Sequence, residues 1–360
     1  MLFSDFRHAW RDSSRFKSVD RDRRSIVFYA QDLWAWKHFG PMVNALVDTH
    51  DKQICYVTSN RNDPVLQMDN PRIRTFYVGL GAFRTSWFQS LEVDVLVMTM
   101  PDFGTYHIKR SKHPVHYIYV HHSMVSSHMA YRPNAFDNFD SILCVGPHHR
   151  EEIRAAEKLG SREEKSLVDA GYGVVDSILA SEGAESAHNS PGGTHVLVAP
   201  SWGANGLLET LGGELVEVLL EAGYQVTVRP HYMTIRSHPR LLRELRKRFG
   251  SHSRFSLDAD LQSQGTVQSS DVMISDWSGA ALEYAFGLER PVLFIDIPKK
   301  VNNPDYERIG IEPVEIAVRS QIGEIVSPDR LFDIPATLDR LCENRGDWKE
   351  AIREVRDRLI

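Results

Sequence analysis

Short apolar runs alternate with longer amphipathic segments along this sequence, and no other feature constrains the fold as strongly. The runs are rich in β-branched and aromatic residues, and most are apolar on both faces of an extended chain. Parallel strands that helices cover on each side show this pattern. The expected strands are residues 26–29, 54–58, 73–78, 93–98, 116–120 and 142–145, and then 196–199, 225–228, 272–275 and 292–295.

A polar segment divides these strands into two groups. Residues 181–194 show no periodicity and are rich in Gly, Ser, Ala and Pro, which predicts a linker or long loop. The 360 residues are about twice the ~150 residues of an ordinary domain. We therefore expect an α/β protein with two Rossmann-like, doubly wound domains and a cleft between them. The expected segments are an N-terminal extension (1–24), a first domain (25–180), the linker (181–194), a second domain (195–335) and a C-terminal helix (336–360) that caps the second domain or packs across the linker.

Charge and cysteine content narrow the classes of function. The formal net charge is -6, so the chain lacks the overall basic field with which proteins bind nucleic acids, and we expect no nucleic-acid partner. A site that binds an anion therefore has to come from a few neighbouring residues and not from the net charge of the chain. Cys55, Cys144 and Cys342 are odd in number and far apart, which indicates neither a disulfide framework nor a CxxC metal site. A reducing compartment, the cytoplasm by default, is the expected location.

The first 24 residues carry apolar and basic side chains at helical spacing. Seven basic residues outnumber four acidic ones, and the apolar positions are Leu2, Phe3, Phe6, Ala9 and Trp10. One interpretation is a helix in a membrane interface, with arginines toward anionic lipid; the other is a helix packed on the protein, or a frayed tail. The sequence has no apolar stretch of about 18 residues and no signal-peptide core, so we expect neither a membrane span nor export.

The strongest local pattern lies at residues 272–290. A buried strand runs into SDWSG at 275–279, and a helix begins at once. This segment brings together a hydroxyl, the N–H groups of Gly279 and Ala280 and the positive end of a helix at the carboxyl end of a parallel strand. Such an arrangement is typical of a phosphate-binding site. Glu283, one turn into the helix, can accept hydrogen bonds from sugar or ribose hydroxyls. The alternative is an ordinary helix whose first turn is capped by Ser278.

Two further strands end in side chains that suit phosphate chemistry. The strand at 225–228 is followed by Arg229-Pro230-His231, where arginine matches phosphate oxygens and histidine can hold a phosphate or protonate a leaving oxygen. The strand at 116–120 runs into His121 and His122, and a histidine there can act as general base for an incoming hydroxyl. In each case the alternative is an incidental, solvated histidine, because the chain contains 16 of them.

Other catalytic signatures are missing from the sequence. No P-loop, GxGxxG or GxSxG occurs, which removes the usual indications of kinases, dehydrogenases and α/β-hydrolases. No HExxH or CxxC spacing supports a metal site. Asp258 and Asp260 are only a weak indication of paired acids that hold a divalent ion. We expect no metal.

Five short motifs occur in the order in which one known family has them. The first is a strand that ends in a histidine-glycine pair, which His122-Ser123 matches, and the second is a GYPRLD segment, which GYGVVD at 171–176 matches. The third and fourth are APTW and RPHP, which correspond to APSW at 199–202 and RPHY at 229–232. The fifth is SDYSS…FDY…RP, which corresponds to SDWSG at 275–279, Glu283-Tyr284 and Arg290-Pro291. Over roughly residues 115–310, the sequence resembles the CDP-glycerol glycerophosphotransferases that prime and polymerise teichoic acids and related capsule polymers.

The resemblance implies a GT-B architecture with the active site between two Rossmann-like domains, no required metal or other cofactor, and peripheral attachment to the inner face of the cytoplasmic membrane. In the implied reaction a hydroxyl of a lipid-linked or polymer acceptor attacks the distal phosphorus of CDP-glycerol, and CMP leaves. His122 is then the base, and His231, with Arg229, stabilises the phosphate. The donor-binding residues that it implies are Ser201, Ser275, Asp276, Ser278, Gly279, Ala280 and Glu283.

Four positions depart from the motifs of the family. Ser123 replaces a glycine, Gly279 the second serine, Tyr232 a proline and Glu283 an aspartate. The donor is therefore open between CDP-glycerol, CDP-ribitol and an ordinary nucleotide sugar. Two other functions stay open as well: a GT-B glycosyltransferase of envelope polysaccharide synthesis, and a non-enzymatic membrane or assembly protein that has kept the fold.

Overall fold

The computed structural model describes residues 3–180, 193–260 and 265–360. The chain divides into two compact units. Unit 1 comprises Met1–His122, Ser127–Val174 and Asn302–Gly310, and unit 2 comprises Ser123–Ser126, Val175–Val301 and Ile311–Ile360. The predicted linker at 181–194 lies outside the described residues, apart from 193 and 194.

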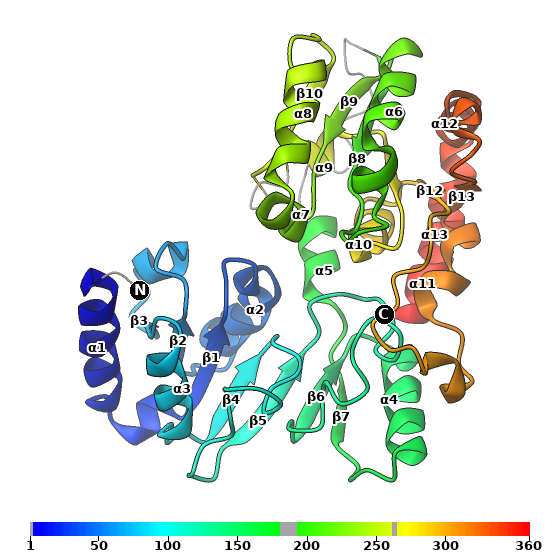
Figure 1. The fold of residues 1–360 in the computed structure, drawn as a ribbon. Helices are drawn as coiled ribbons and strands as arrows, with labels where there is room; N and C mark the ends of the chain where they lie inside the picture. The colour runs from blue at the N-terminus through cyan, green and yellow to red at the C-terminus, as the bar shows by residue number, and fades with distance from the viewer. Residues whose placement is uncertain (1–2, 181–192, 261–264) are drawn as a thin grey trace. The chain divides into compact units, whose positions relative to one another are not determined.

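Unit 1 is built on a seven-stranded sheet with the strand order β3-β2-β1-β4-β5-β6-β7 (Figure 1). All neighbouring strands run parallel. The strands are β1 (Ile26–Ala30), β2 (Ile54–Thr58), β3 (Ile73–Tyr77), β4 (Val95–Met98), β5 (His116–Val120), β6 (Ser141–Cys144) and β7 (Ser166–Asp169). The helices are α1 (Phe3–Lys17), α2 (Ala35–Asn44), α3 (Ala82–Gln89) and α4 (Pro147–Leu159), with short helical turns η1 (Arg21–Arg24), η2 (Ala45–Thr49), η3 (Pro64–Gln67) and η4 (Tyr306–Ile309).

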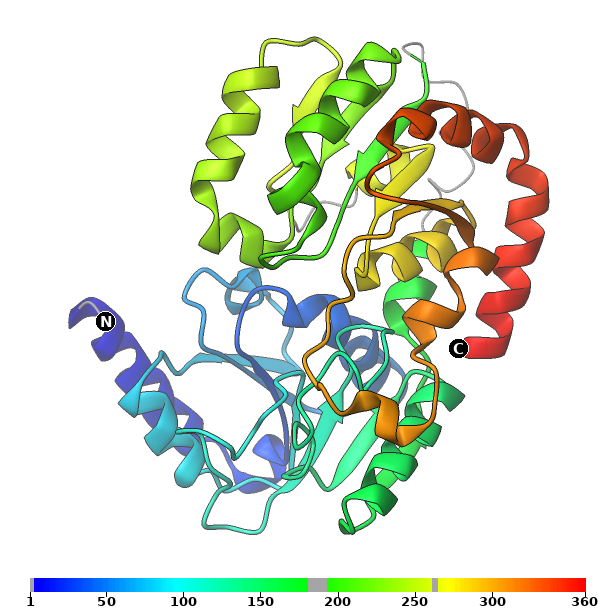
Figure 2. The same cartoon turned by 45° about the vertical axis from the view of Figure 1, so that its right-hand side comes forward.

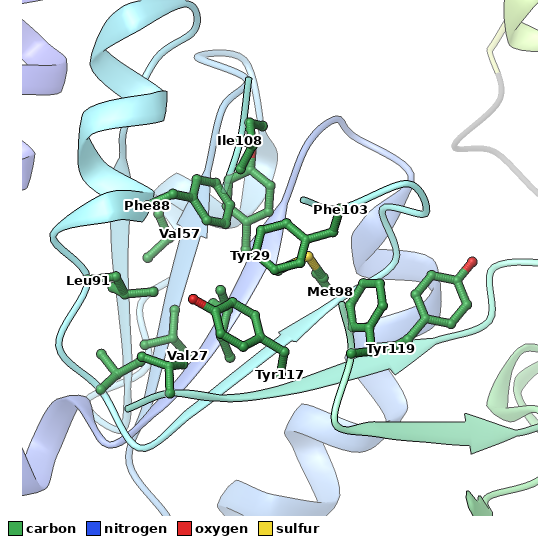
Figure 3. Close-up of a cluster of buried hydrophobic side chains, with 14 of the residues drawn as sticks. Val27, Tyr29, Val57, Phe88, Leu91, Met98, Phe103, Ile108, Tyr117 and Tyr119 are labelled. Atoms are coloured by element: carbon green, nitrogen blue, oxygen red, sulfur yellow. The ribbon is translucent and has the colours of Figure 1, made fainter. Parts of the chain in front are cut away.

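A buried cluster rich in aromatic side chains packs on one face of this sheet (Figure 3). Phe103 stacks on Tyr117 with 4.8 Å between ring centroids, and Phe88 meets Tyr29 edge to face at 4.7 Å. A second buried cluster, which includes Phe28 and residues of α2, lies among the strand side chains that point the other way. The strands are apolar at consecutive positions because both faces of the sheet are buried.

The N-terminal helix α1 packs against β3. Its inner face buries Ala9 and Phe16, and the Phe16 ring meets Phe76 at 5.3 Å. The buried Asp12 carboxylate accepts the backbone N–H of Tyr77 at 3.0 Å. The interpretation of this segment as a helix packed on the protein therefore describes its inner face. None of the described helices is long and apolar enough to cross a membrane.

Unit 2 contains a six-stranded parallel sheet with the order β10-β9-β8-β11-β12-β13. The strands are β8 (His195–Val198), β9 (Gln225–Val228), β10 (Phe255–Leu257), β11 (Val272–Ser275), β12 (Val292–Ile295) and β13 (Gly323–Val326). The helices are α5 (Gly173–Leu179), α6 (Leu207–Glu221), α7 (Tyr232–Ser237), α8 (Pro239–Phe249), α9 (Gly265–Ser269), α10 (Gly279–Leu288), α11 (Val314–Ala317), α12 (Ile334–Glu343) and α13 (Arg345–Leu359), with turns η5 (Arg319–Gln321) and η6 (Leu331–Asp333). All ten strands expected from the sequence are present.

Three strands were not expected: β7, β10 and β13. Each lies at the edge of its sheet. Edge strands are covered less completely, and their sequences SLVD, FSL and GEIV are short or partly polar. They therefore lack the continuous apolar run by which the other ten were recognised.

The C-terminal segment 336–360 forms two helices, α12 and α13, where the sequence predicted one (Figure 2). The break lies at Asn344. Ile352 and Val355 of α13 are buried, and Arg353 and Arg356 bind the carboxylate of Glu289 at the end of α10. The segment thus caps unit 2.

Candidate functional site

Most of the side chains predicted to be functional follow the carboxyl ends of neighbouring strands in unit 2. β8 runs into residues 199–202, β9 into 229–231, β11 into 275–278 and β12 into 296–300. The connections leave the sheet in opposite directions at β8 and β11. In open α/β sheets, ligands bind outside the carboxyl ends of the strands at such a reversal of strand order. We call these four loops the switch-point site.

Asp276 and Ser275 face into the protein. The Asp276 carboxylate is 1% exposed and accepts the backbone N–H groups of Ser201 at 2.6 Å and Leu207 at 3.4 Å. Burial raises the pKa of this carboxyl, and these hydrogen bonds oppose the rise. The buried Ser275 hydroxyl donates to the carbonyl of Ala199 at 2.9 Å. Both side chains tie the loop after β8 to the loop after β11, a geometry that favours positioning over direct contact with a ligand.

The chain itself caps the start of α10. Ser278 is the N-cap residue, and its Oγ accepts the N–H of Ala280 at 3.3 Å. The interpretation of Ser278 as a helix cap is therefore confirmed, and the Ala280 amide already has a partner. A Cβ atom at Gly279 would lie 2.1 Å from the Oγ of Ser123. Ser123, in the segment that follows β5, thus fills the place that a side chain at 279 would take.

His231 is oriented by the backbone that follows it. It is the N-cap residue of α7, and its Nδ1 accepts the N–H of Met233 at 3.0 Å. A nitrogen that accepts a hydrogen bond carries no proton, so the neutral ring carries its proton at Nε2. The ring stacks on Trp202 with 6.0 Å between centroids. His231 is thus arranged to donate a hydrogen bond from Nε2.

Arg229 has a carboxylate partner within the same sheet. Its Nη1 donates to Asp258 Oδ2 at 2.9 Å and to Thr266 Oγ1 at 3.1 Å, and the ion pair is largely buried. Asp258 therefore balances an arginine, and its partner in the sequence pattern, Asp260, is exposed. Among the described residues, no group of three His, Cys, Asp or Glu side chains could hold a metal ion.

Ser201 and Glu283 differ in their access to a ligand. Ser201 is buried, and its hydroxyl joins its backbone N–H in hydrogen bonding to Asp276, which lowers the pKa of that carboxyl against the effect of burial. Glu283 is half-buried, one turn after the start of α10. Of the two, Glu283 is better placed to meet a ligand.

Lys300 is a site residue that the sequence analysis missed. Its Nζ lies over the ring of Trp202, 4.1 Å from the centroid. Burial lowers the pKa of this ammonium to about 8, and the carboxylates of Asp276 and Glu209 oppose the shift. The only sequence signal was a pair of lysines shortly after the apolar run of β12.

His122 belongs to unit 1, whereas the other predicted site residues belong to unit 2. Its ring is exposed at the end of β5, while its neighbour His121 is buried and stacks on His149 with 3.8 Å between ring centroids. Tyr119 Oη lies 3.3 Å from His122 Nδ1. Burial raises the pKa of Tyr119 well above its usual value, so this hydroxyl stays protonated. Of the two adjacent histidines, His122 is the one that solvent can reach.

The sequence of residues 46–300, more than half of the chain, matches the family model for CDP-glycerol:poly(glycerophosphate) glycerophosphotransferase. The chain belongs to this glycerophosphotransferase family. No curated protein matches it.

Solved structures similar to this glycerophosphotransferase-family chain share its fold. A UDP-GlcNAc 2-epimerase from Methanocaldococcus jannaschii, in complex with UDP-GlcNAc and UDP, is 13% identical with a TM-score of 0.56, over 92% of this chain and 98% of that one. The epimerase from Neisseria meningitidis bound to UDP-GlcNAc is 12% identical with a TM-score of 0.55, over 91% and 93%. The predicted fold class, α/β with two Rossmann-like domains of the GT-B type, is confirmed.

Two family-motif residues of α10 and its end have structural roles. Tyr284 is buried, and its hydroxyl donates to the carbonyl of Ser270 at 3.1 Å. The buried Arg290 donates to the same carbonyl and to that of Gln268 at 2.7 Å. Tyr284 and Arg290 therefore stabilise the segment that leads into β11, the strand that Asp276 follows.

Proposed function

We propose that this protein transfers a polyol phosphate, glycerol phosphate in the first instance, from a CDP-alcohol to a hydroxyl group of a lipid-linked or polymer acceptor. CMP is released, and the product is a teichoic acid-like or capsular polymer. The match of residues 46–300 to the glycerophosphotransferase family carries this proposal. The hydrogen-bond donors of the switch-point site support it, because the His231 imidazole N–H and the Lys300 ammonium both favour an anion.

In the proposed reaction the acceptor oxygen forms a bond to the phosphorus distal to cytidine. The bond from that phosphorus to the bridging oxygen breaks, and the electron pair leaves with CMP. His122, the exposed histidine of its pair, takes the proton of the acceptor hydroxyl. His231 donates from Nε2 to a phosphate oxygen. Most of the rate acceleration comes from positioning and charge stabilisation, as is general for phosphoryl transfer.

The remaining predicted polar side chains then divide into those that hold the loops and one that we propose meets the donor. Ser275, Asp276 and Ser201 hold the loops, and Ser278 holds the first turn of α10. Arg229, through Asp258, orders the loop before His231. Glu283 is the side chain that we propose meets a hydroxyl of the donor.

A nucleotide-sugar glycosyltransferase is the second candidate function. The similar folds of the two epimerases, which were solved with UDP-GlcNAc, favour it. The products separate the two functions: phosphotransfer releases CMP, and glycosyl transfer releases a nucleoside diphosphate. A thermal-shift comparison of CDP-glycerol, CDP-ribitol, CMP, UDP-sugars and GDP-sugars identifies the donor class, because a ligand that binds only the native state raises its stability.

Turnover with variants tests the proposed function. With CDP-glycerol and a lipid-linked or short polyol-phosphate acceptor, the wild type should release CMP. His122→Ala and His231→Ala should each lower kcat by about 10²- to 10⁴-fold. The exposed histidines His113 and His252 supply matched controls, and H113A and H252A should keep the wild-type rate. Turnover of a sugar nucleotide but of no CDP-alcohol would contradict the proposal. Unchanged function in cells for both variants would favour the non-enzymatic alternative.

We also propose that the outer face of α1 contacts an anionic membrane surface, which places the protein where lipid-linked acceptors lie. Phe6 is 48% and Trp10 62% exposed. Arg7 and Arg11 are exposed on the same helix. Exposed aromatic and basic side chains on one helix are typical of interfacial binding.

A further inference from the structure

The ammonium group of Lys300 has no hydrogen bond and no ion pair among the residues that the structure describes. Its close contact is the face of Trp202, at 4.1 Å from the ring centroid. The side chain is half-buried, so water replaces these missing partners only in part. A cation in this state attracts an anion more strongly than one on the open surface, because less solvent screens the charge.

Two carboxylates, Asp276 and Glu209, act on the charge of Lys300. Asp276 accepts two backbone N–H groups of the β8 loop. Glu209 Oε1 accepts the hydroxyl of Thr234 at 2.8 Å, and its buried Oε2 has no hydrogen-bond partner among the described residues. Both act on Lys300 electrostatically without forming an ion pair with it. The ammonium group of Lys300 can therefore still form an ion pair with an anionic ligand.

The surroundings of Lys300 indicate which anion fits. Lys300 follows β12, the neighbour of β11 in the sheet, at the edge where ligands of such sheets bind. Trp202 has Lys300 over its ring and also stacks on His231, which carries its proton at Nε2. An ammonium and an imidazole N–H on one aromatic ring match an anion with several acceptor oxygens, as a diphosphate has.

We propose that Lys300 binds the diphosphate of the donor at the switch-point site and neutralises charge on the phosphate that departs with CMP. The assignment rests on the proposed function for the identity of the donor, and it adds a binding residue to that site. Trp202 positions the lysine through contact with its ammonium group. In this proposal His231 supplies a hydrogen bond to the same diphosphate.

The assignment predicts a dependence on pH. The carboxylates of Asp276 and Glu209 act on the charge of Lys300, and the His231 ring lies against the same tryptophan. Lys300 has a pKa of about 8 in the free protein, so it is charged below that pH and neutral above it. Affinity for the donor should therefore fall as pH rises through about 8. Lys300→Arg should abolish the fall, because arginine stays charged.

The experiment measures binding of CDP-glycerol, CMP and cytidine, together with CMP release, for wild type, K300M, K300R and K299M. Lys299 is the matched control, because it is adjacent and exposed. K300M should weaken binding of CDP-glycerol and CMP by about 10- to 100-fold and leave cytidine unchanged. K300R should bind CDP-glycerol within a few-fold of wild type, and K299M should match wild type. Thermal unfolding of each variant verifies that it is folded.

Two results would overturn the role of Lys300. One is wild-type affinity for CDP-glycerol in folded K300M, and the other is an equal loss of cytidine affinity, which would make the lysine a support for Trp202 only.

Failure of the proposed function gives a different result. In that case the wild type releases no CMP from any CDP-alcohol, and inorganic diphosphate becomes the probe. Binding of diphosphate that K300M loses would then support the anion site, and binding that K300M retains would refute it.

Discussion

Ser123 and Gly279 show how two single residues of this chain depend on each other. The family motifs have a glycine at the first position and a serine at the second, and this chain has the reverse. The Oγ of Ser123 lies 2.1 Å from the point where a Cβ of residue 279 would be. The two departures from the motif are therefore sterically complementary, and one side chain, not two, fills the space beside the first turn of α10.

Gly279→Ser alone should destabilise the protein by about 1–3 kcal/mol, because the added side chain forces Ser123 to move. Adding Ser123→Gly should restore most of that loss. Chemical denaturation of the two single variants and the double variant measures the coupling. Gly346→Ala is the control, since nothing lies within 4 Å of a Cβ there. Additive effects of the two substitutions would show that the side chains do not compete for one space.

Among the elements, α13 is attached to the end of α10 largely through the carboxylate of Glu289. Glu289 follows α10 in the left-handed conformation with φ 53°, and it accepts hydrogen bonds from Arg353 at 2.7 Å and Arg356 at 2.9 Å. Hydrogen bonding from Arg353, and then from Arg356, lowers the pKa of Glu289 to about 2. The ionised form of this carboxylate is therefore more stable in the folded protein than in the unfolded chain.

Glu289→Gln should lower the free energy of unfolding by about 1–2 kcal/mol at pH 7. The pKa of Glu289 is depressed on folding, from 4.5 to about 2. The stabilisation is thus fully present above 4.5 and is lost as pH falls through about 2. Urea unfolding at pH 7 and near pH 2 should show a difference from wild type only at the higher pH. Glu354→Gln, at an exposed position of α13, is the control. A difference that is equal at both values of pH would mean that the ion pairs are not its source.

Helix α1 has an inner face that packs on the protein and an outer face that we propose contacts a membrane surface. The inner face, with Phe16 and Asp12, holds β3 and should stay folded when the outer face is changed. The double variant F6Q/W10Q should lose about 10-fold or more in binding to vesicles rich in phosphatidylglycerol. F332Q, at a side chain that is 73% exposed elsewhere, should bind as wild type does. Vesicle cosedimentation is the measurement, and undiminished binding of the double variant would remove α1 as the membrane contact.

For the whole molecule, periodicity was sufficient to predict two parallel α/β sheets, because strands buried on both faces need apolar side chains at every position. The order of the strands needed the structure. The β8–β11 reversal places the loops after β8 and β11 side by side, and no local pattern carries that information. The three missed strands share the same cause, since an edge strand is specified by its one neighbour more than by its own sequence.

Residue types and motif order alone indicated the family, the fold class and the segments that carry the candidate site, because helix starts, strand ends and phosphate-binding side chains are local features of a sequence. The roles of individual side chains came from packing. Asp276 and Ser275 are buried between two loops, Ser123 replaces a side chain at 279, and Lys300 lies over Trp202 without a carboxylate partner among the described residues. Each of these depends on atoms far apart in the chain, and burial and pairing are properties of the folded chain that no stretch of sequence contains.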